Sequence, residues 1–208
     1  MNPTYDEIVK ANSLRGDEIK KTPLIHSPTF SDLTNSEVYL KAEFTQKTGS
    51  FKIRGAYYKI KSLSEEEKKH GVIAASAGNH AQGVAFASSL EKIPCTIVMP
   101  KNASPAKVAA TRGYGANVIL EGINYDESYS KAKEIAKETG AIIIQAFDDP
   151  HIIAAQGVVG LEILEDLPDV DEIYLPIGGG GLAAGTVIAI KEKNPNIKVI
   201  GVQSKSFP

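Results

Sequence analysis

The sequence predicts an α/β protein with parallel β-sheets, and three observations support this fold class. Short apolar runs rich in β-forming residues alternate with helical patterns almost to the end of the chain. Glycine and proline residues mark the joins between these segments. The connections are short, and strand–helix–strand units of this kind form right-handed crossovers between parallel strands. We therefore expect helices to cover both faces of the sheets.

The predicted strands are short apolar segments bounded by turn residues: 38–44, 72–75, 95–99, 117–120, 142–145, 172–176 and 197–202. The helices expected between them lie near 51–63, 79–90, 104–113, 126–138, 150–165 and 182–192. Thr4 and Glu7 form a capping-box pattern, which predicts a further helix at the N-terminus. The charged run SEEEKKH at 64–70 is expected to be a solvated connector and a domain boundary.

Composition argues against several classes of function. The chain has 208 residues, of which 42% are hydrophobic and 23% charged, as in ordinary globular proteins. Its net charge of −2 does not indicate a nucleic-acid or membrane surface. The single cysteine, Cys95, is expected in the core; it leaves no intrachain disulfide or multi-cysteine zinc site and fits a reducing cytoplasm. The uncharged segment 173–190 contains a proline and four glycines, which favour a buried strand, turn and helix over a membrane span.

Lys52 is the first candidate for chemistry. It follows Ser50, a predicted N-cap, and shares the apolar face of its helix with Ala56 and Ile60. The positive end of the helix dipole and the core-facing position both lower the pKa of an ammonium group. Two interpretations stay open. The side chain either packs its stem and extends its charge to solvent, or keeps a partly neutral amine that forms a Schiff base with an aldehyde.

The second candidate is the glycine run in PIGGGGLAAG, at 176–185, between a predicted strand and a predicted helix. Glycine lets backbone N–H groups approach an anion closely, and a helix N-terminus favours negative charge, so we expect a phosphate site. The alternative is a tight turn with close helix–strand packing. Gly178, Gly180 and Ala183 also fit the loose dinucleotide pattern, but residues 202–204 supply no acidic side chain for a ribose.

The third candidate lies in AASAGNHAQGVAFA, at 74–87, where another strand turns into a helix. Ser76, Asn79 and His80 surround the helix start, so that backbone and side-chain donors converge as a carboxylate requires. The alternative is that Ser76 and Asn79 only cap the helix. His80 has no partner at metal-ligand spacing, so no metal site is expected. Together, the three candidates match the needs of pyridoxal phosphate and an amino-acid substrate.

Four ordered segments resemble the motifs of one family: SFKIRGA, SAGNHAQGVA, FDDPHIIAAQG and GGGGL. They resemble the fold-type II (tryptophan synthase β-like) pyridoxal-phosphate enzymes, and among these the short-form, catabolic-type threonine dehydratases. The resemblance covers essentially the whole chain. It implies two α/β domains with parallel sheets and the cofactor between them: large-domain parts at 1–69 and 145–208, and a small domain at 70–144. The chain stops just after a predicted strand, so we expect a C-terminally truncated molecule with an incomplete large domain.

The resemblance also implies a role for each candidate residue. Lys52 would form the Schiff base with pyridoxal 5'-phosphate and later act as the base at the substrate Cα. Phe51 would lie beside the cofactor ring, and Asn79 would bond the phenolic oxygen of that ring. Ser76, Asn79 and His80 would receive the substrate carboxylate. Backbone N–H groups would bind the phosphate, namely those of Gly178, Gly179, Gly180, Gly181 and Leu182.

The implied reaction is the β-elimination of L-threonine to 2-oxobutyrate and ammonia, with L-serine giving pyruvate. Ala77 favours it, because serine racemases of this fold carry a second serine there, and alanine donates no proton to Cα. A serine racemase, another β-eliminating or β-replacing enzyme, and an inactive fragment that binds only a phosphate ligand or a partner chain stay open. Gln203 stands where some relatives have a glutamate cation ligand, which weakens the case for a metal.

Partners and location also follow from the resemblance. Relatives form dimers or tetramers, so a homo-oligomer is expected, and the short catabolic dehydratases make AMP a candidate effector. No nucleic-acid or membrane partner is expected, and the location is expected to be cytoplasmic. The role stays open between isoleucine biosynthesis and threonine catabolism. The group facing the pyridine nitrogen would lie beyond Pro208, so we expect this chain alone to retain cofactor weakly and turn over little.

Overall fold

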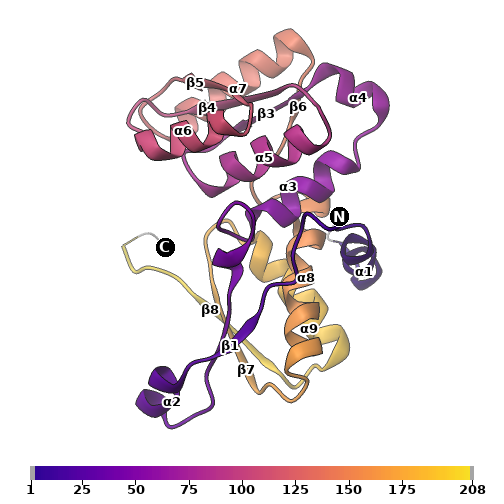
Figure 1. Cartoon of the computed structure of the whole chain (residues 1–208), viewed down its shortest axis with the longest axis vertical. Helices are drawn as coiled ribbons and strands as arrows, with labels where there is room; N and C mark the ends of the chain where they lie inside the picture. The colour runs from indigo at the N-terminus through magenta and orange to yellow at the C-terminus, as the bar shows by residue number, and fades with distance from the viewer. Residues whose placement is uncertain (1–2, 207–208) are drawn as a thin grey trace.

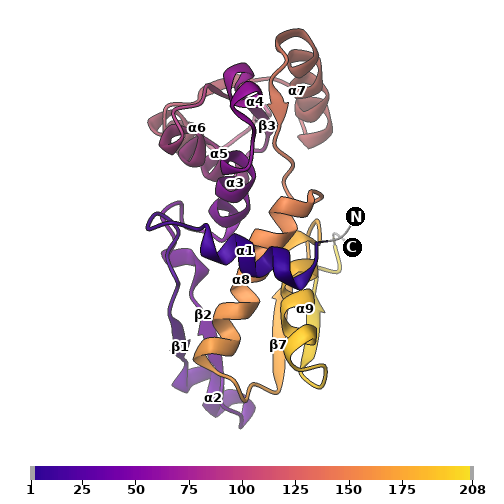
Figure 2. The same ribbon diagram turned by 90° about the vertical axis from the view of Figure 1, so that its right-hand side faces the viewer.

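The structure is a computed structural model that describes residues 3–206. Figures 1 and 2 show an elongated molecule made of an upper and a lower body, with helix α3 (Lys52–Lys61) between them. A parallel sheet with its helices forms the upper body. The lower body holds two small sheets and four α-helices, so the chain passes from the lower body to the upper and back.

A four-stranded parallel sheet in the order β5-β4-β3-β6 forms the centre of the upper body. Its strands are β3 (Val72–Ala75), β4 (Cys95–Met99), β5 (Asn117–Leu120) and β6 (Ile142–Ile143). The helices of this body are α4 (Glu65–His70), α5 (Asn79–Leu90), α6 (Pro105–Gly113) and α7 (Tyr125–Thr139). Figure 2 shows α5 and α6 on one face of the sheet and α7 on the other.

Apolar side chains fill both faces of this sheet. On one face, Ile97 and Met99 of β4 belong to a cluster that extends to α3 and α5, and both are fully buried. On the other face, Ile73 and Val98 pack with Ala132 of α7. Burying one such side chain contributes about 1.5–3 kcal/mol, so these clusters hold the carboxyl ends of β3 and β6 in place.

The lower body contains two short strand pairs. Strand β1 (Leu24–His26) pairs antiparallel with β2 (Tyr39–Lys41), and helix α2 (Pro28–Thr34) connects them. Strand β7 (Glu172–Pro176) pairs parallel with β8 (Lys198–Val202). The short 3-10 helix η1 (Glu43–Thr45) follows β2.

Glycines let three helices of the lower body pack closely together. These helices are α1 (Tyr5–Ser13), α8 (Pro150–Asp166) and α9 (Gly181–Lys193). A Cβ atom on Gly157 of α8 would lie 2.7 Å from the carbonyl oxygen of Gly185 in α9. A Cβ atom on Gly185 would overlap the carbonyl of Ile153. Since α8 starts beside α3 and α9 starts after β7, this contact fixes where the two helix starts lie.

A buried ion-pair network attaches the N-terminal segment to α3 and α8. Arg54 donates to Glu162 at 2.7 Å and to Glu43 at 2.8 Å. Glu162 is fully buried and also pairs with Lys41 at 2.7 Å and Arg15 at 3.1 Å. Burial alone would raise the pKa of Glu162, but hydrogen bonds from Arg54 and Lys41 lower it overall. Removing one partner from such a buried network costs about 3–5 kcal/mol.

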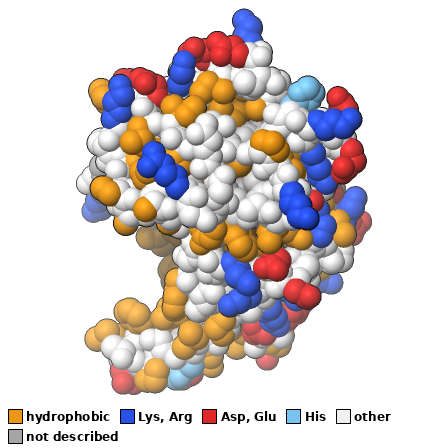
Figure 3. All heavy atoms as spheres, turned by 45° about the horizontal axis from the view of Figure 1, so that its top comes forward, with side chains coloured by type: hydrophobic (Ala, Val, Ile, Leu, Met, Phe, Trp, Pro, Cys, Tyr) orange, Lys and Arg blue, Asp and Glu red, His pale blue; other side chains and the backbone are white. Residues whose placement is uncertain are grey.

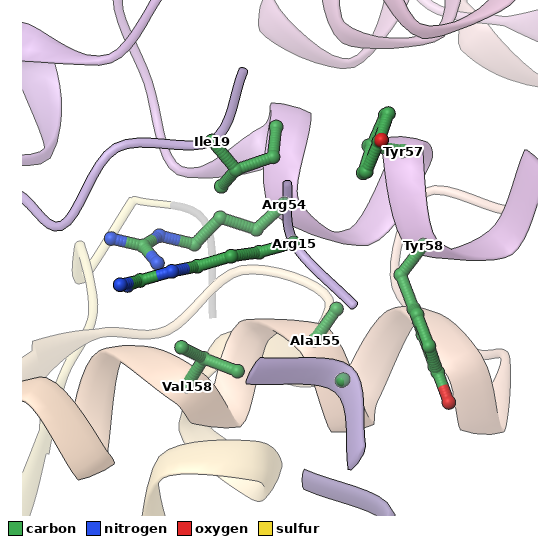
Figure 4. A pocket seen from close by; sticks show the side chains of 8 residues that line it. Arg15, Ile19, Arg54, Tyr57, Tyr58, Ala155 and Val158 are labelled. Carbon is green, nitrogen blue, oxygen red and sulfur yellow. The ribbon is translucent and has the colours of Figure 1, made fainter. Parts of the chain in front are cut away.

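Figure 4 shows a small cavity beside this network, where the side chains of Arg15 and Arg54 lie next to each other. Its volume is about 10 Å³, which is room for about one water molecule. Tyr57, Tyr58 and Val158 also line it. A cavity of this size cannot hold an amino acid or a cofactor, so the candidate site must lie elsewhere.

Most predicted elements form at their predicted positions. The bounds of β3, β4, β5, β7 and α5 are as predicted, and Thr4 and Glu7 form the predicted capping box. Cys95 is buried in the core, which raises the pKa of its thiol to about 11. In residues 3–206, no helix is both long enough and apolar enough to span a bilayer.

Three predictions about elements are wrong. The run 64–70 is not a connector: residues 65–70 form helix α4, because Ser64 and Glu67 make a capping box and Lys68, Lys69 and His70 occupy its last turn. The strand predicted at 38–44 is only Tyr39–Lys41, and it pairs antiparallel with a strand that was not predicted. Helix α2 was also missed, although Ser27 caps it and proline occupies its first position.

Candidate active site

Lys52 is the first residue of α3, and its side chain turns inward. Its Nζ atom donates to the carbonyl oxygen of Ala146 at 2.7 Å and lies 5.4 Å from the centre of the Phe51 ring. Ser50 is not the N-cap that the sequence predicts: Phe51 occupies the cap position. The Ser50 hydroxyl instead accepts a 3.4 Å hydrogen bond from the Lys52 N–H.

Burial lowers the pKa of the Lys52 amine, as expected from the sequence. Ala56 and Ile60, on the same helix face, are fully buried. Helix α5 approaches this turn so closely that a Cβ atom on Gly83 would lie 3.2 Å from the Lys52 carbonyl carbon. The amine ends on a backbone carbonyl from another segment, a geometry that favours the reactive-amine interpretation over a stem that extends its charge to solvent.

The glycine loop, residues 178–181, connects β7 to α9. Gly180 has a φ of +84°, which glycine adopts without strain. A Cβ atom on Gly179 would overlap the ring of Phe147, and one on Gly181 would lie 2.7 Å from the Phe147 carbonyl oxygen. Within residues 3–206, the N–H groups from Gly178 to Ala183 have no hydrogen-bond acceptor. Unpaired N–H groups at the start of a helix are suited to an anion such as phosphate.

Helix α5 begins at Asn79 without a side-chain cap. Gly78 occupies the cap position, and the Ser76 hydroxyl accepts a 3.2 Å hydrogen bond from the Gly78 N–H. The Asn79 side chain is exposed and has no hydrogen bond to the described part of the chain. The alternative, in which the side chains of Ser76 and Asn79 only cap the helix, is therefore wrong. Ala77 is exposed in the same turn.

His80 is almost entirely buried and faces away from solvent. Its Nε2–H donates to the carbonyl oxygen of Ile144 at 3.0 Å. The pKa of His80 is lowered to about 4, because burial and the charge of Lys52 together outweigh the opposite effect of the Ile144 bond. The ring is therefore neutral at pH 7, and the backbone N–H of His80 has no hydrogen-bond acceptor among residues 3–206.

One positive charge stands beside this turn. The Nζ atom of Lys107, from α6, lies 3.3 Å from the point that a Cβ atom on Gly78 would occupy. Lys107 is exposed. Sequence analysis did not single out this residue, because only the fold brings the start of α6 next to the start of α5.

The connector 144–149, between β6 and α8, touches all three candidates. Its Ile144 carbonyl accepts from His80, its Ala146 carbonyl accepts from Lys52, and Phe147 packs against the glycine loop. Asp149 caps α8 and forms a 2.9 Å ion pair with Lys59 of α3. The sequence predicts only the end of a strand at 142–145 and a family motif in this segment. Its backbone contacts carry no sequence signal, so its place in the site was missed.

The remaining candidate residues surround this arrangement. Phe51 is partly buried under the Lys52 amine, Leu182 lies in the first turn of α9, and Gln203 directly follows β8. Among residues 3–206, no three His, Cys, Asp or Glu side chains gather in a way that could hold a metal ion. The site therefore combines the desolvated amine of Lys52 with the starts of α5 and α9, whose first N–H groups are unpaired within residues 3–206.

Comparisons with known proteins point to one family. A family model described as pyridoxal-phosphate dependent enzyme matches residues 16–208. An L-threonine ammonia-lyase from Thermotoga maritima is 54% identical over 205 residues, covering 99% of this chain and 51% of that protein. A catabolic L-threonine dehydratase from Escherichia coli is 50% identical over 201 residues, covering 97% of this chain and 61% of that protein.

A solved structure of maize serine racemase superposes on this chain with a TM-score of 0.95 and 36% sequence identity, over 99% of this chain and 62% of the other. The chain therefore matches these proteins along nearly all of its own length. It spans about half the length of the Thermotoga protein.

Proposed function

The chain belongs to the family of pyridoxal-phosphate dependent enzymes, with the fold-type II architecture, and from this premise we propose that it carries the catalytic lysine of an L-threonine ammonia-lyase. The reaction converts L-threonine to 2-oxobutyrate and ammonia, and L-serine to pyruvate. Two relatives with 54% and 50% identity bear the names L-threonine ammonia-lyase and L-threonine dehydratase, which supports this substrate class.

The residues present fit pyridoxal 5'-phosphate. The unpaired N–H groups of the glycine loop and of Leu182 suit its phosphate, and the desolvated amine of Lys52 suits its aldehyde. Phe51 lies under that amine and offers an apolar surface to a ring. Asn79, exposed and without a hydrogen bond to residues 3–206, has a free amide for a phenolic oxygen.

When bound, the cofactor supplies an electron-accepting ring that stabilises negative charge at the substrate Cα. Lys52 then acts as the base, because its lowered pKa increases the fraction of neutral amine that can take a proton. The turn around Ser76, Asn79 and His80 holds the substrate carboxylate through hydroxyl, amide and backbone N–H groups. These contacts orient Cα toward the amine, and the β-hydroxyl group leaves as water with the proton that Lys52 takes from Cα.

Serine racemase is the second candidate, because the maize enzyme superposes over 99% of this chain. Racemisation needs a proton donor on the face of Cα opposite the lysine. In the turn after β3 this chain has Ala77, which carries no such proton. Elimination needs one base only, so Ala77 favours the ammonia-lyase.

The observation that carries the proposal is the hydrogen bond from the Lys52 amine to the Ala146 carbonyl. The next residue, Phe147, packs against the glycine loop, so one segment brings the amine close to the proposed phosphate site. The test is to load the protein with pyridoxal 5'-phosphate, reduce it with borohydride and map the label by mass spectrometry. We expect the label on Lys52, and oxo-acid release from L-threonine and L-serine but not D-serine. In Lys52→Ala, we expect a loss of activity of about 10³-fold or more and no label. Elimination that survives this substitution would refute the proposal.

We also propose a homo-oligomer, a dimer or tetramer. Large hydrophobic side chains are exposed on the lower end of the molecule: Ile25, Phe30, Leu33 and Leu40. Figure 3 shows hydrophobic side chains gathered on this lower projection. Exposed apolar patches of this kind are typical of interfaces. AMP as an effector and a cytoplasmic location are also part of the proposal.

The domain division expected from the sequence also stands as a proposal, with large-domain parts at 1–69 and 145–208 and a small domain at 70–144. The four-stranded sheet supports it, because all its strands fall between residues 72 and 143. Two hydrophobic clusters also support it, because one lies entirely within 73–143 and the other entirely within 159–199.

A further inference from the structure

Phe147 occupies an unexpected position for a large aromatic side chain. It is 38% exposed and belongs to none of the hydrophobic clusters of residues 3–206. Its ring and backbone instead lie against Gly179 and Gly181, where added Cβ atoms would clash with it. The Phe147 ring contributes little to a core and lies against Gly179, while the Phe147 backbone lies against Gly181, which points to a role in that loop.

The glycine loop has few other constraints. The last hydrogen bond before it joins the Ile177 N–H to Val202, and the first after it joins the Ala184 N–H to Gly180. Between these bonds, the loop N–H groups have no acceptor within residues 3–206. Glycine loses more conformational freedom on ordering than any other residue. An anion that had to order this loop itself would bind more weakly, because ordering costs free energy at the moment of binding.

The connector that carries Phe147 is itself anchored. The Ile144 N–H donates to Ile73 of β3 at 2.9 Å, and the Ile144 carbonyl accepts from His80. At the other end, Asp149 caps α8 and pairs with Lys59. Between these anchors, Ala146 accepts from Lys52. Adjacent residues of one fixed segment therefore contact the amine and the glycine loop.

We propose that Phe147 is a positioning residue that pre-orders the glycine loop for the cofactor phosphate and sets its place relative to the Lys52 amine. This inference rests on the proposed function and deepens it. It assigns the phosphate affinity in part to a side chain that does not itself need to touch the phosphate.

The test separates the phosphate from the aldehyde. Pyridoxal 5'-phosphate and pyridoxal, which lacks the phosphate, are titrated into the wild type, Phe147→Ala, Phe147→Leu and Phe147→Tyr. Bound aldehyde is trapped on Lys52 with borohydride and quantified by mass spectrometry. Phe44→Ala is the matched control, since Phe44 is 70% exposed and lies outside the site.

We expect Phe147→Ala to weaken pyridoxal 5'-phosphate about tenfold and to leave pyridoxal unchanged, because only the phosphate uses the loop. Inorganic phosphate should compete less well in this variant. Phe147→Tyr keeps the ring and should restore the affinity, and Phe147→Leu should fall between. Hydrogen exchange at the amides of 178–183 should accelerate in Phe147→Ala, while the thermal unfolding temperature stays close to that of Phe44→Ala.

The inference would be overturned if Phe147→Ala lowered the affinity for both aldehydes equally, or for neither. It would also be overturned if Phe147→Tyr failed to restore the affinity for pyridoxal 5'-phosphate. These results differ from a failure of the proposed function. In that case neither aldehyde would label Lys52 in the wild type, which would overturn the proposed function and this inference together.

Discussion

Helices α5 and α9 both begin after a strand and a glycine-containing turn, yet the two starts are built differently. At the start of α5, side chains organise the turn: the Ser76 hydroxyl bonds Gly78, and the buried His80 ring bonds Ile144. At the start of α9, the turn has only backbone N–H groups, and Phe147 packs against it from outside.

The difference matches the two anions proposed for these sites. A phosphate is compact and doubly charged, so a loop of bare N–H groups suffices and any added Cβ atom interferes. A substrate carboxylate must be held in one orientation so that Cα faces the lysine, which requires side chains at defined places. The substitutions below test this contrast between the two helix starts.

The largest effect is expected on the acid stability of the α5 start. Burial and Lys52 lower the pKa of His80 from 6.5 to about 4. Between these pH values the unfolded chain binds a proton at His80 that the folded chain does not bind. The free energy of unfolding is therefore at its full value above pH 6.5 and decreases as the pH falls toward 4. The loss amounts to about 3 kcal/mol. His80→Gln keeps a donor for Ile144 and should remove this part of the pH dependence in urea unfolding.

His70→Gln serves as the control, since His70 is exposed and 49% of its side-chain surface is accessible. If wild type and His80→Gln lose stability in parallel between pH 6.5 and pH 4, the buried-histidine explanation is wrong.

Gly179→Ala should impair the α9 start and spare the α5 start. Its Cβ atom would overlap the Phe147 ring, and overpacking of this kind costs about 1–3 kcal/mol. We expect pyridoxal 5'-phosphate to bind about 5- to 150-fold more weakly, measured by equilibrium dialysis. In a Phe147→Ala background the added methyl group should cost less, because the clash is gone.

Gly113→Ala is the matched control for this glycine, because a Cβ atom there meets no atom within 4 Å. Additive effects of Gly179→Ala and Phe147→Ala would contradict the contact.

Ser76→Ala should have the complementary effect. It removes the acceptor for the Gly78 N–H, a hydrogen bond worth about 0.5–1.5 kcal/mol. We expect KM for L-threonine to rise about 2- to 10-fold, with cofactor affinity unchanged. Ser89→Ala changes a serine at the far end of the same helix and should alter neither quantity. A loss of cofactor affinity in Ser76→Ala would mean that the two helix starts do not divide the anions as proposed.

Lys107→Gln should have the smallest effect. The amine stands beside Gly78 but is exposed, so its attraction for a carboxylate is screened by water and salt. We expect KM for L-threonine to rise about two- to threefold at low ionic strength and to match the wild type at high ionic strength. Lys101→Gln removes an exposed lysine that already pairs with Glu121, and it should leave KM unchanged.

Much of this arrangement could be predicted from the sequence, and the limits have physical causes. Except for α4, the strands and helices of the upper body were predictable because glycine, proline and periodic apolar residues mark them locally. The lowered pKa of Lys52 was predictable for the same reason, since its position on an apolar helix face is a local property. The Ala146 carbonyl, the ring of Phe147 and the amine of Lys107 were not, because each meets its partner across the fold through groups that leave no pattern in the chain.

The lower body was harder to predict than the upper. Strand β1 and helix α2 are short, and β1 pairs with β2 through an antiparallel register that no crossover pattern indicates. The exposed apolar residues of this region also weaken the inside–outside contrast on which strand prediction depends.

The Arg54–Glu162 network has a consequence for protein synthesis. Arg15 pairs with a carboxylate 147 positions later, and Arg54 with the same carboxylate 108 positions later. At ribosomal speeds, these arginines wait roughly 5 to 30 s before Glu162 is even made. The N-terminal segment therefore cannot reach its final place before α8 leaves the ribosome.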